Sequence, residues 1–215
     1  MSNTSIDKKI KAYVDDFVRQ NKAAQAMAHL LRSAGTGFRP VVDHITFRTN
    51  DVEKRAKEFT SEGFVWDQSR GSNGIIEYND WLAKVYRRPG FPAIFIDQAY
   101  EGKRGESSLI PAWVKRFGDQ TLHHVAVAVD DIEESIEALK KLGVECAGEI
   151  VGAPGSDLRQ IFTKAEAKDG QAFSVIELTE RHNGYAGFLP PQADGLMKSS
   201  VEKAYNQNAK GKIKN

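Results

Sequence analysis

Two histidines and two carboxylates occupy matching places in two similar stretches of the sequence. His44 stands 80 positions before His124, and Asp97 stands 80 positions before Glu177. Each histidine lies near the start of an apolar run, and each carboxylate lies near the end of another. Imidazole nitrogens and carboxylate oxygens are common ligands of divalent transition metals. We therefore predict a metal site formed by His44, His124 and Glu177.

Three further residues bear on how such a site would bind a substrate. Asp97 has the charge of a fourth ligand but is one methylene shorter than glutamate, so we expect it beside the ligands or as a fourth ligand. Arg48 lies four positions after His44. Because side chains alternate along a strand, both would face the same side, about 13 Å apart at roughly 3.3 Å per residue. We expect Arg48 to bind a substrate carboxylate. By the same alternation, His123 would point away from the site.

The elements that would carry these residues are repeated as well. Each copy begins with a strand, continues with a helix that a glycine ends, and closes with further strands. The first strand, helix and glycine are 41–49, 51–62 and Gly63 in one copy, and 122–129, 132–142 and Gly143 in the other. The later strands are 64–69, 74–79, 83–88 and 92–97, then 147–152, 158–164 and 172–179. The sequence thus predicts a β-α-β-β-β unit that occurs twice.

Helices are predicted outside the repeat. The sequence indicates a helix pair over 6–33, a short helix at 109–117 and a final helix at about 193–206. We expect an α+β fold in which two modules form an open metal-binding barrel. The expected divisions are an N-terminal helical extension at 1–38, a first module at 39–99, a linker at 100–121, a second module at 122–190, and a C-terminal helix and tail at 191–215.

The composition is that of an ordinary globular protein. Its 215 residues carry a net charge of +1 and include a single cysteine. The near-neutral charge argues against nucleic acid or a membrane surface as an obligatory partner, and no apolar run approaches the roughly 20 residues that span a bilayer. One cysteine excludes an internal disulfide and fits a reducing compartment, so we expect a cytoplasmic protein. The expected partner is a small carboxylate-bearing substrate, and a homodimer with modules exchanged between chains stays open.

The paired modules, with a histidine on the first strand and a carboxylate on the last, resemble the vicinal oxygen chelate superfamily over residues 41–190. This superfamily includes glyoxalase I, extradiol dioxygenases, hydroxyphenylpyruvate dioxygenase and metal-free antibiotic-binding proteins. The resemblance implies that two curved sheets enclose a divalent metal whose ligands are drawn from four positions. In this chain those positions are His44, Asp97, His124 and Glu177.

Two stretches are similar to particular dioxygenases of that superfamily. The His-x-x-x-Arg spacing of His44 and Arg48 is similar to the bacterial 2-oxoadipate dioxygenase/decarboxylase family, in which the arginine holds a substrate carboxylate. Residues 175–181 and 184–188 are similar to the end of hydroxyphenylpyruvate dioxygenase, in which the glutamate binds iron and a helix covers the site. The similarities imply an Fe(II) dioxygenase that oxidatively decarboxylates or hydroxylates a small 2-oxo acid. Three protein ligands would leave room on the iron for such an acid and for oxygen.

Two other functions stay open on the sequence alone. A glyoxalase-type lyase or isomerase would use nickel, zinc or cobalt, with Glu177 or another carboxylate as base. Manganese is a further alternative to iron. A metal-free binding protein would use the same cavity, with His44 and His124 as core residues. Tyr185 and Phe188 would either close the mouth of the barrel or anchor the last helix. Four polar residues could also line the cavity, but they are expected to be ordinary strand surface: Glu77, Arg159, Gln160 and Gln171.

Overall fold

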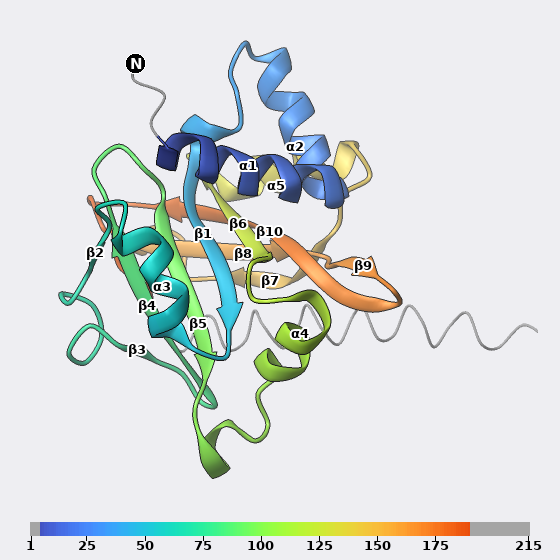
Figure 1. Ribbon diagram of the computed structural model, residues 1–215. Coiled ribbons are helices and arrows are strands. Elements are labelled where there is room, and N and C mark those ends of the chain that lie inside the picture. The colour runs from blue at the N-terminus through green and yellow to red at the C-terminus, as the bar shows by residue number, and fades with distance from the viewer. Residues whose placement is uncertain (1–4, 190–215) are drawn as a thin grey trace, which may run out of the picture.

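The computed structural model describes residues 5–189, and two amphipathic helices begin it (Figure 1). Helix α1 (Ser5–Gln20) is followed by α2 (Lys22–Ser33), and the side chain of Asn21 between them accepts the backbone N–H of Ala24. Apolar residues three or four positions apart bury one face of α1; they are Ile6, Ile10, Val14 and Phe17. The helix pair predicted over 6–33 is therefore confirmed. The helix predicted at about 193–206 lies outside the described residues.

Two modules follow, with their elements in the same order. The first consists of β1 (Val42–Thr49), α3 (Val52–Thr60), β2 (Val65–Trp66), β3 (Ile76–Glu77), β4 (Trp81–Arg87) and β5 (Ala93–Ala99). The second consists of β6 (Leu122–Val129), α5 (Ile132–Lys141), β7 (Cys146–Val151), β8 (Leu158–Thr163), β9 (Glu166–Lys168) and β10 (Gln171–Arg181). The short helix η1 (Arg39–Val41) precedes the first module, and η2 (Gly102–Gly105) and α4 (Ile110–Phe117) connect the two. An aspartate caps the helix of each module, namely Asp51 and Asp131.

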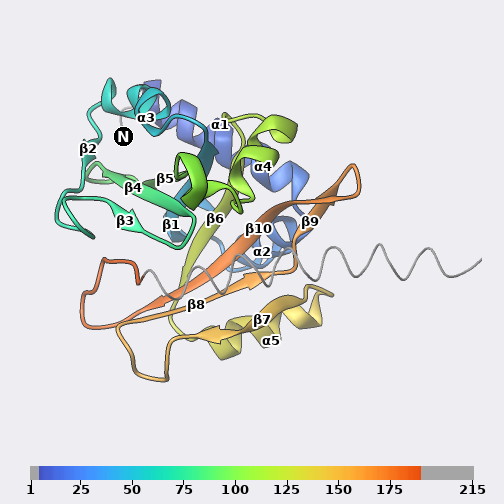
Figure 2. The ribbon, with the colours of Figure 1, turned by 90° about the horizontal axis from the view of Figure 1, so that it is seen from below.

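The two modules share one open mixed sheet. Its strand order is β2-β4-β5-β1-β6-β10-β8-β7, so the order in one module mirrors that in the other. The antiparallel pair β1–β6 joins them, and each of these strands is flanked by a parallel partner, β5 or β10. Figure 2 shows the modules side by side, with α3 on one side and α5 on the other. The α+β fold with two β-α-β-β-β modules is confirmed.

Both strands of the central pair contain an extra residue directly before the histidine. The register places Asp43 as the extra residue of β1 and His123 as that of β6. A bulge of this kind bends the strand and re-aims a side chain. The strict alternation used to predict that His123 points away from the site therefore fails at this position. His123 is buried, with 4% of its surface exposed.

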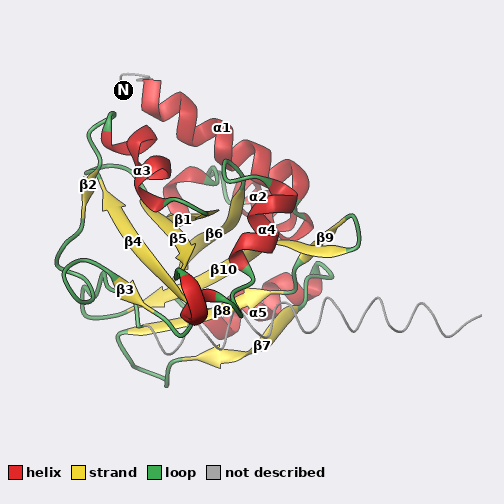
Figure 3. Ribbon diagram, turned by 60° about the horizontal axis from the view of Figure 1, so that its bottom comes forward, coloured by secondary structure: helices red, strands yellow, loops and turns green. Residues whose placement is uncertain are grey.

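Apolar side chains on the two faces of the sheet form two cores. One core lies between the sheet and helices α1, α2, α3 and α5, and includes Ile45, Ile94 and Ile176. The other includes Phe95 and Phe162 and packs against α4. Figure 3 shows the strands as one curved layer among these helices. No helix within residues 5–189 is long and apolar enough to cross a membrane.

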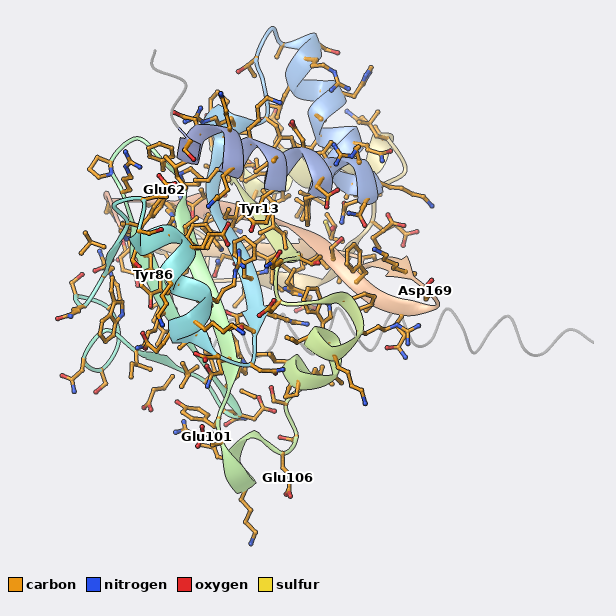
Figure 4. All side chains as sticks on the ribbon, in the orientation of Figure 1. Tyr13, Glu62, Tyr86, Glu101, Glu106 and Asp169 are labelled. Carbon is orange, nitrogen blue, oxygen red and sulfur yellow. The ribbon has the colours of Figure 1, made fainter. Side chains whose placement is uncertain are left out.

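A short hairpin is the main element that the sequence prediction lacked. Strand β9 pairs with the start of β10, and Asp169 and Gly170 form the turn, both at positive φ. An Asp-Gly pair between strand residues is a strong signal for such a turn, so the sequence did contain the information. The turn lies at the outer tip of the hairpin, where Asp169 is labelled in Figure 4. Arg116 of α4 donates to the Asp169 carbonyl at 2.8 Å and so ties the hairpin to α4.

Candidate metal centre

His44, His124 and Glu177 converge near the centre of the sheet. The histidines come from the central pair β1–β6, and Glu177 comes from β10, the strand next to β6. The two histidine Nε2 atoms are 3.3 Å apart. Glu177 Oε2 lies 3.7 Å from His44 Nε2 and 3.3 Å from His124 Nε2. The three residues are 2%, 6% and 3% exposed. The structure therefore brings together the three residues that the sequence singled out.

The spacing and chemistry of these atoms suit a divalent metal. Ligand atoms about 2.1 Å from a shared ion stand roughly 3.0 to 3.4 Å apart. The ligand atoms of the three residues all lie within 4.8 Å of one another. Two imidazoles and a carboxylate are a donor set used with zinc and with non-haem iron. The donor set thus suggests a divalent metal and leaves its identity open.

Two neighbours orient the Glu177 carboxylate. Thr179 Oγ1 donates to Glu177 Oε1 at 2.7 Å, and Gln160 Nε2 donates to the same oxygen. Oε1 is therefore engaged, and Oε2 faces the histidines. The expectation that Gln160 is ordinary strand surface is wrong, because it is 5% exposed and holds the carboxylate.

Of the other three residues expected at the strand surface, one is buried and two are exposed. Arg159 is buried and pairs with Glu133 and Glu180, so the expectation for it is also wrong. Glu77 and Gln171 are exposed, as expected, and Gln171 also lines a cavity beside Arg48.

His44 is held by a chain of polar contacts that the sequence prediction missed. Its Nδ1 lies 2.7 Å from Asp43 Oδ1, and Arg181 donates to both carboxylate oxygens of Asp43, at 2.8 and 2.9 Å. Arg181 also donates to the Gly187 carbonyl at 2.7 Å, beside Phe188. The Phe188 ring meets that of His44 edge-on at 5.1 Å. A carboxylate behind a metal-binding histidine fixes its orientation.

His124 has a different partner. Its Nδ1 lies 3.0 Å from the Nδ1 of His123, which the bulge turns to the same side. Thr46 Oγ1 lies 2.8 Å from His124 Nε2. The repeat itself was the signal for Asp43 and His123, because they are 80 positions apart and each precedes a candidate ligand histidine.

For each of the three candidate ligands, burial and a neighbouring charge have opposite effects on the pKa. Burial by itself would lower the pKa of His44, but Glu177 and Asp43 outweigh it and raise the pKa to about 9. Burial by itself would raise the pKa of Glu177, but His44 lowers it to about 2. For His124, burial lowers the pKa to about 3 despite Glu177.

Asp97 lines the same cavity but is not in the cluster of ligand atoms that lie within 4.8 Å of one another, and the last strands of the two modules differ in register. Glu177 pairs with Ala126, two residues after His124, whereas Asp97 pairs with Arg48, four residues after His44. At roughly 3.3 Å per residue, the difference moves Asp97 about 7 Å along its strand. Phe95, which pairs with Thr46, holds the place in the first module that Glu177 holds in the second. Asp97 and Glu177 are therefore 80 positions apart in the sequence but do not occupy equivalent positions in the sheet.

Two cavities are lined by histidines of the central strands, one by His44 and His124 and the other by His123. One, of about 30 Å³, is lined by the three candidate ligands, Asp97, Gln160 and several aromatic residues that include Phe95, Phe162 and Phe188. The other, of about 100 Å³, is lined by Arg48, Trp113, His123 and residues of β10, and is called the Arg48 chamber below. Among the described residues the two linings share no member. Arg48 is 2% exposed, with its guanidinium carbon 5.5 Å from the centre of a Trp113 ring.

Several solved structures share the fold of this chain. A candidate hydrolase from Shewanella frigidimarina NCIMB 400 is 22% identical, with a TM-score of 0.71 over 86% of this chain and 98% of that chain. Hydroxyglutarate synthase from Oryza sativa, in complex with 2-oxoadipate, is 15% identical, with a TM-score of 0.66 over 94% of each chain. A candidate glyoxalase-superfamily protein from Ralstonia eutropha JMP134 is 12% identical, with a TM-score of 0.61 over 83% of this chain and 84% of that chain.

Sequence comparison adds no closer relationship. No protein-family model matches the sequence, and neither does any curated protein. The structural likeness establishes the fold alone, which this chain shares with these three proteins. The predicted resemblance is confirmed at that level.

Proposed function

We propose that this chain is an Fe(II)-dependent dioxygenase that oxidatively decarboxylates or hydroxylates a small 2-oxo acid. The observation that carries the proposal is the convergence of His44 Nε2, His124 Nε2 and Glu177 Oε2 in a buried cavity. Iron held by these atoms would supply coordination of the 2-oxo acid and reaction with oxygen. The similar fold of a hydroxyglutarate synthase bound to 2-oxoadipate supports this substrate class.

The residues around the ligands have separate tasks in this proposal. Arg48 binds the far carboxylate of the substrate, because a buried guanidinium forms strong charge-assisted hydrogen bonds with carboxylates. Phe95, Phe162 and Phe188 line the smaller cavity and exclude water from it. Asp97 lies beside Arg48 in the register and is assigned to the surroundings of the site rather than to the ligand set.

Metal analysis is the first test. We expect the purified chain to bind one equivalent of Fe(II) or Co(II), and His44→Ala to abolish stoichiometric binding. His29→Asn is the matched control, because His29 is exposed on α2. A wild-type protein that takes up no metal would contradict the proposal and support a metal-free binding protein.

Oxygen consumption is the second test. With iron bound and a panel of three- to six-carbon 2-oxo acids, we expect oxygen uptake that depends on one or more of the acids, and Arg48→Met to raise the KM for that acid more than it lowers kcat. Turnover with nickel, zinc or cobalt that needs no oxygen would instead identify a lyase or isomerase.

A further inference from the structure

His123 is a buried residue without a role in the proposed function. It is 4% exposed, and its ring meets that of Trp113 edge-on at 5.7 Å. One of its nitrogens faces His124, and the ring also lines the Arg48 chamber. His123 thus stands between the candidate metal centre and a second cavity, which gives it contact with both.

The hydrogen bond between the two rings fixes where each ring carries its proton once His124 binds a metal. His124 Nε2 faces His44 and Glu177, so a metal would take the lone pair of that nitrogen. A neutral His124 then carries its proton on Nδ1 and donates it to Nδ1 of His123. Because His123 accepts through Nδ1, its own proton is on Nε2. This step rests on the proposed function, in which His124 is a ligand.

The Nε2–H of His123 is then a donor for the Arg48 chamber. A guanidinium and a neutral N–H donor in the lining of one cavity suit an anion with two oxygens, such as a carboxylate. Much of the remaining lining is apolar, with Phe117, Phe173 and Val175 among its members. The volume of about 100 Å³ is below the roughly 150 Å³ of a cavity that holds benzene. The chamber therefore suits a carboxylate on a short carbon chain.

We propose that His123 is a positioning residue that links the two sites: it holds His124 in the tautomer that binds metal, and it donates its Nε2–H to a carboxylate held by Arg48. Metal and carboxylate then favour each other's binding by the same factor in both directions. Asp43 performs the first task for His44, but it pairs with Arg181 and is absent from the described lining of the chamber. Donation to the carboxylate in the Arg48 chamber is therefore assigned to His123 of the second module alone.

Two substitutions separate the two tasks of His123. In His123→Asn the amide oxygen still accepts from His124 Nδ1, but the shorter side chain offers no donor to the chamber. In His123→Phe the ring remains and both hydrogen bonds are lost. We expect His123→Phe to lower the affinity for Co(II) by about 10- to 100-fold, and His123→Asn to lower it by less than about threefold. His29→Asn is the control for a histidine-to-asparagine change on the surface.

Propionate is the probe for the chamber. Its affinity is measured by calorimetry on the full chain, first free of metal and then saturated with Co(II). For the wild type we expect tighter binding with Co(II), and we expect Arg48→Met to abolish binding. Both His123 variants should bind propionate about tenfold more weakly than the wild type in the presence of Co(II), because each lacks one donor. In both, Co(II) should no longer strengthen propionate binding.

The outcomes separate this inference from the proposed function. A wild type that binds no Co(II) contradicts the proposed function. A wild type that binds Co(II), with His123→Phe binding it equally well, overturns the first task of His123. Propionate affinity that is unchanged in His123→Asn overturns the second task. Circular dichroism checks that each variant folds, and His123→Asn alone decides the second task should His123→Phe fail to fold.

Discussion

The candidate ligand histidine is backed by a carboxylate in the first module and by another histidine in the second. Asp43 and His123 hold equivalent bulge positions, and each lies at the Nδ1 of the histidine that follows it. The duplicated backbone has thus kept the geometry while one side chain has changed the charge. His44, beside Glu177 and Asp43, has its pKa raised to about 9, whereas burial lowers that of His124 to about 3. Two imidazoles at related positions therefore differ strongly in basicity.

The last strands of the modules differ in a second way. In β10 the residue beside the histidines is Glu177, and in β5 the residue at that place is Phe95. Phe95 lines the cavity next to the candidate ligands, and its ring lies 5.9 Å from that of His44. An aromatic ring thus stands where a fourth protein ligand would be expected from symmetry. Among the described residues, therefore, only the second module places a carboxylate in the cluster of candidate ligands, although Asp97 of the first module lines the same cavity.

The largest expected effect tests this difference between the last strands. We expect Glu177→Gln to lower the affinity for Co(II) on the order of 100-fold or more, because it removes a charged ligand. We expect Asp97→Asn to change it by less than about threefold. Burial raises the pKa of Asp97 to about 8, so the group is largely protonated at neutral pH and asparagine resembles it. Competition titration with a chelator measures both. A loss of equal size in the two variants would make Asp97 a fourth ligand.

A second expected effect compares the helices of the modules. Phe59 on α3 and Leu139 on α5 stand 80 positions apart, and both are buried. We expect Phe59→Ala to lower the free energy of unfolding by about 4 kcal/mol and Leu139→Ala by about 3 kcal/mol, because both leave a cavity and phenylalanine leaves the larger one. Urea unfolding measures the two values. Lys57→Ala on the exposed side of α3 is the control and should change the value by less than about 0.5 kcal/mol.

Much of the fold and the three candidate ligands were predictable because they depend on local patterns. The helices of both modules follow from an aspartate cap, an apolar face and a closing glycine, which act over a few residues. His44 and His124 were found because the repeat keeps its spacing through the first strand and the helix. Such patterns can be read without knowledge of how strands pair.

The features that escaped prediction depend on how strands pair. The place of His123 follows from an extra residue in β6, which exists only relative to β1. The place of Asp97 follows from a two-residue difference in register between β5 and β10. The role of Gln160 requires that β8 lie beside β10. None of these relations is encoded in the spacing of residues along one strand, so alternation alone gave the wrong answer for His123.

A third, smaller effect tests the partners behind the two histidines. We expect Asp43→Asn to lower the affinity for Co(II) by about tenfold, because the amide still accepts from His44 Nδ1 but its negative charge is gone. We expect His123→Asp to raise it by about threefold, since a carboxylate would then stand behind both ligands. The same chelator competition reports both changes. Opposite signs would confirm that the charge of the partner tunes each imidazole, and equal losses would show that only packing at these positions matters.

The smallest expected effect compares ion pairs at the two edges of the sheet. Asp67 pairs with Arg87 of β4 and is 12% exposed at its side chain, whereas Glu145 pairs with Lys164 and is 66% exposed. Although burial opposes it, hydrogen bonds from Ser69 and Arg87 lower the pKa of Asp67 from 3.8 to about 2. We expect Asp67→Asn to lower the free energy of unfolding at pH 7 on the order of 1 kcal/mol, and Glu145→Gln by less than about 0.5 kcal/mol.

The effect of Asp67→Asn on the free energy of unfolding should depend on pH. The folded protein holds Asp67 ionised more firmly than the unfolded chain does, so this contribution is complete above pH 4 and is lost as the pH falls towards 2. The difference between the wild type and Asp67→Asn should therefore shrink over that interval in urea unfolding at a series of pH values. A difference that persists unchanged at pH 2 would mean that Asp67 acts through packing or neutral hydrogen bonds to Ser69 rather than through its charge. The charges of Asp67 and Glu145 would then contribute equally little to the free energy of unfolding.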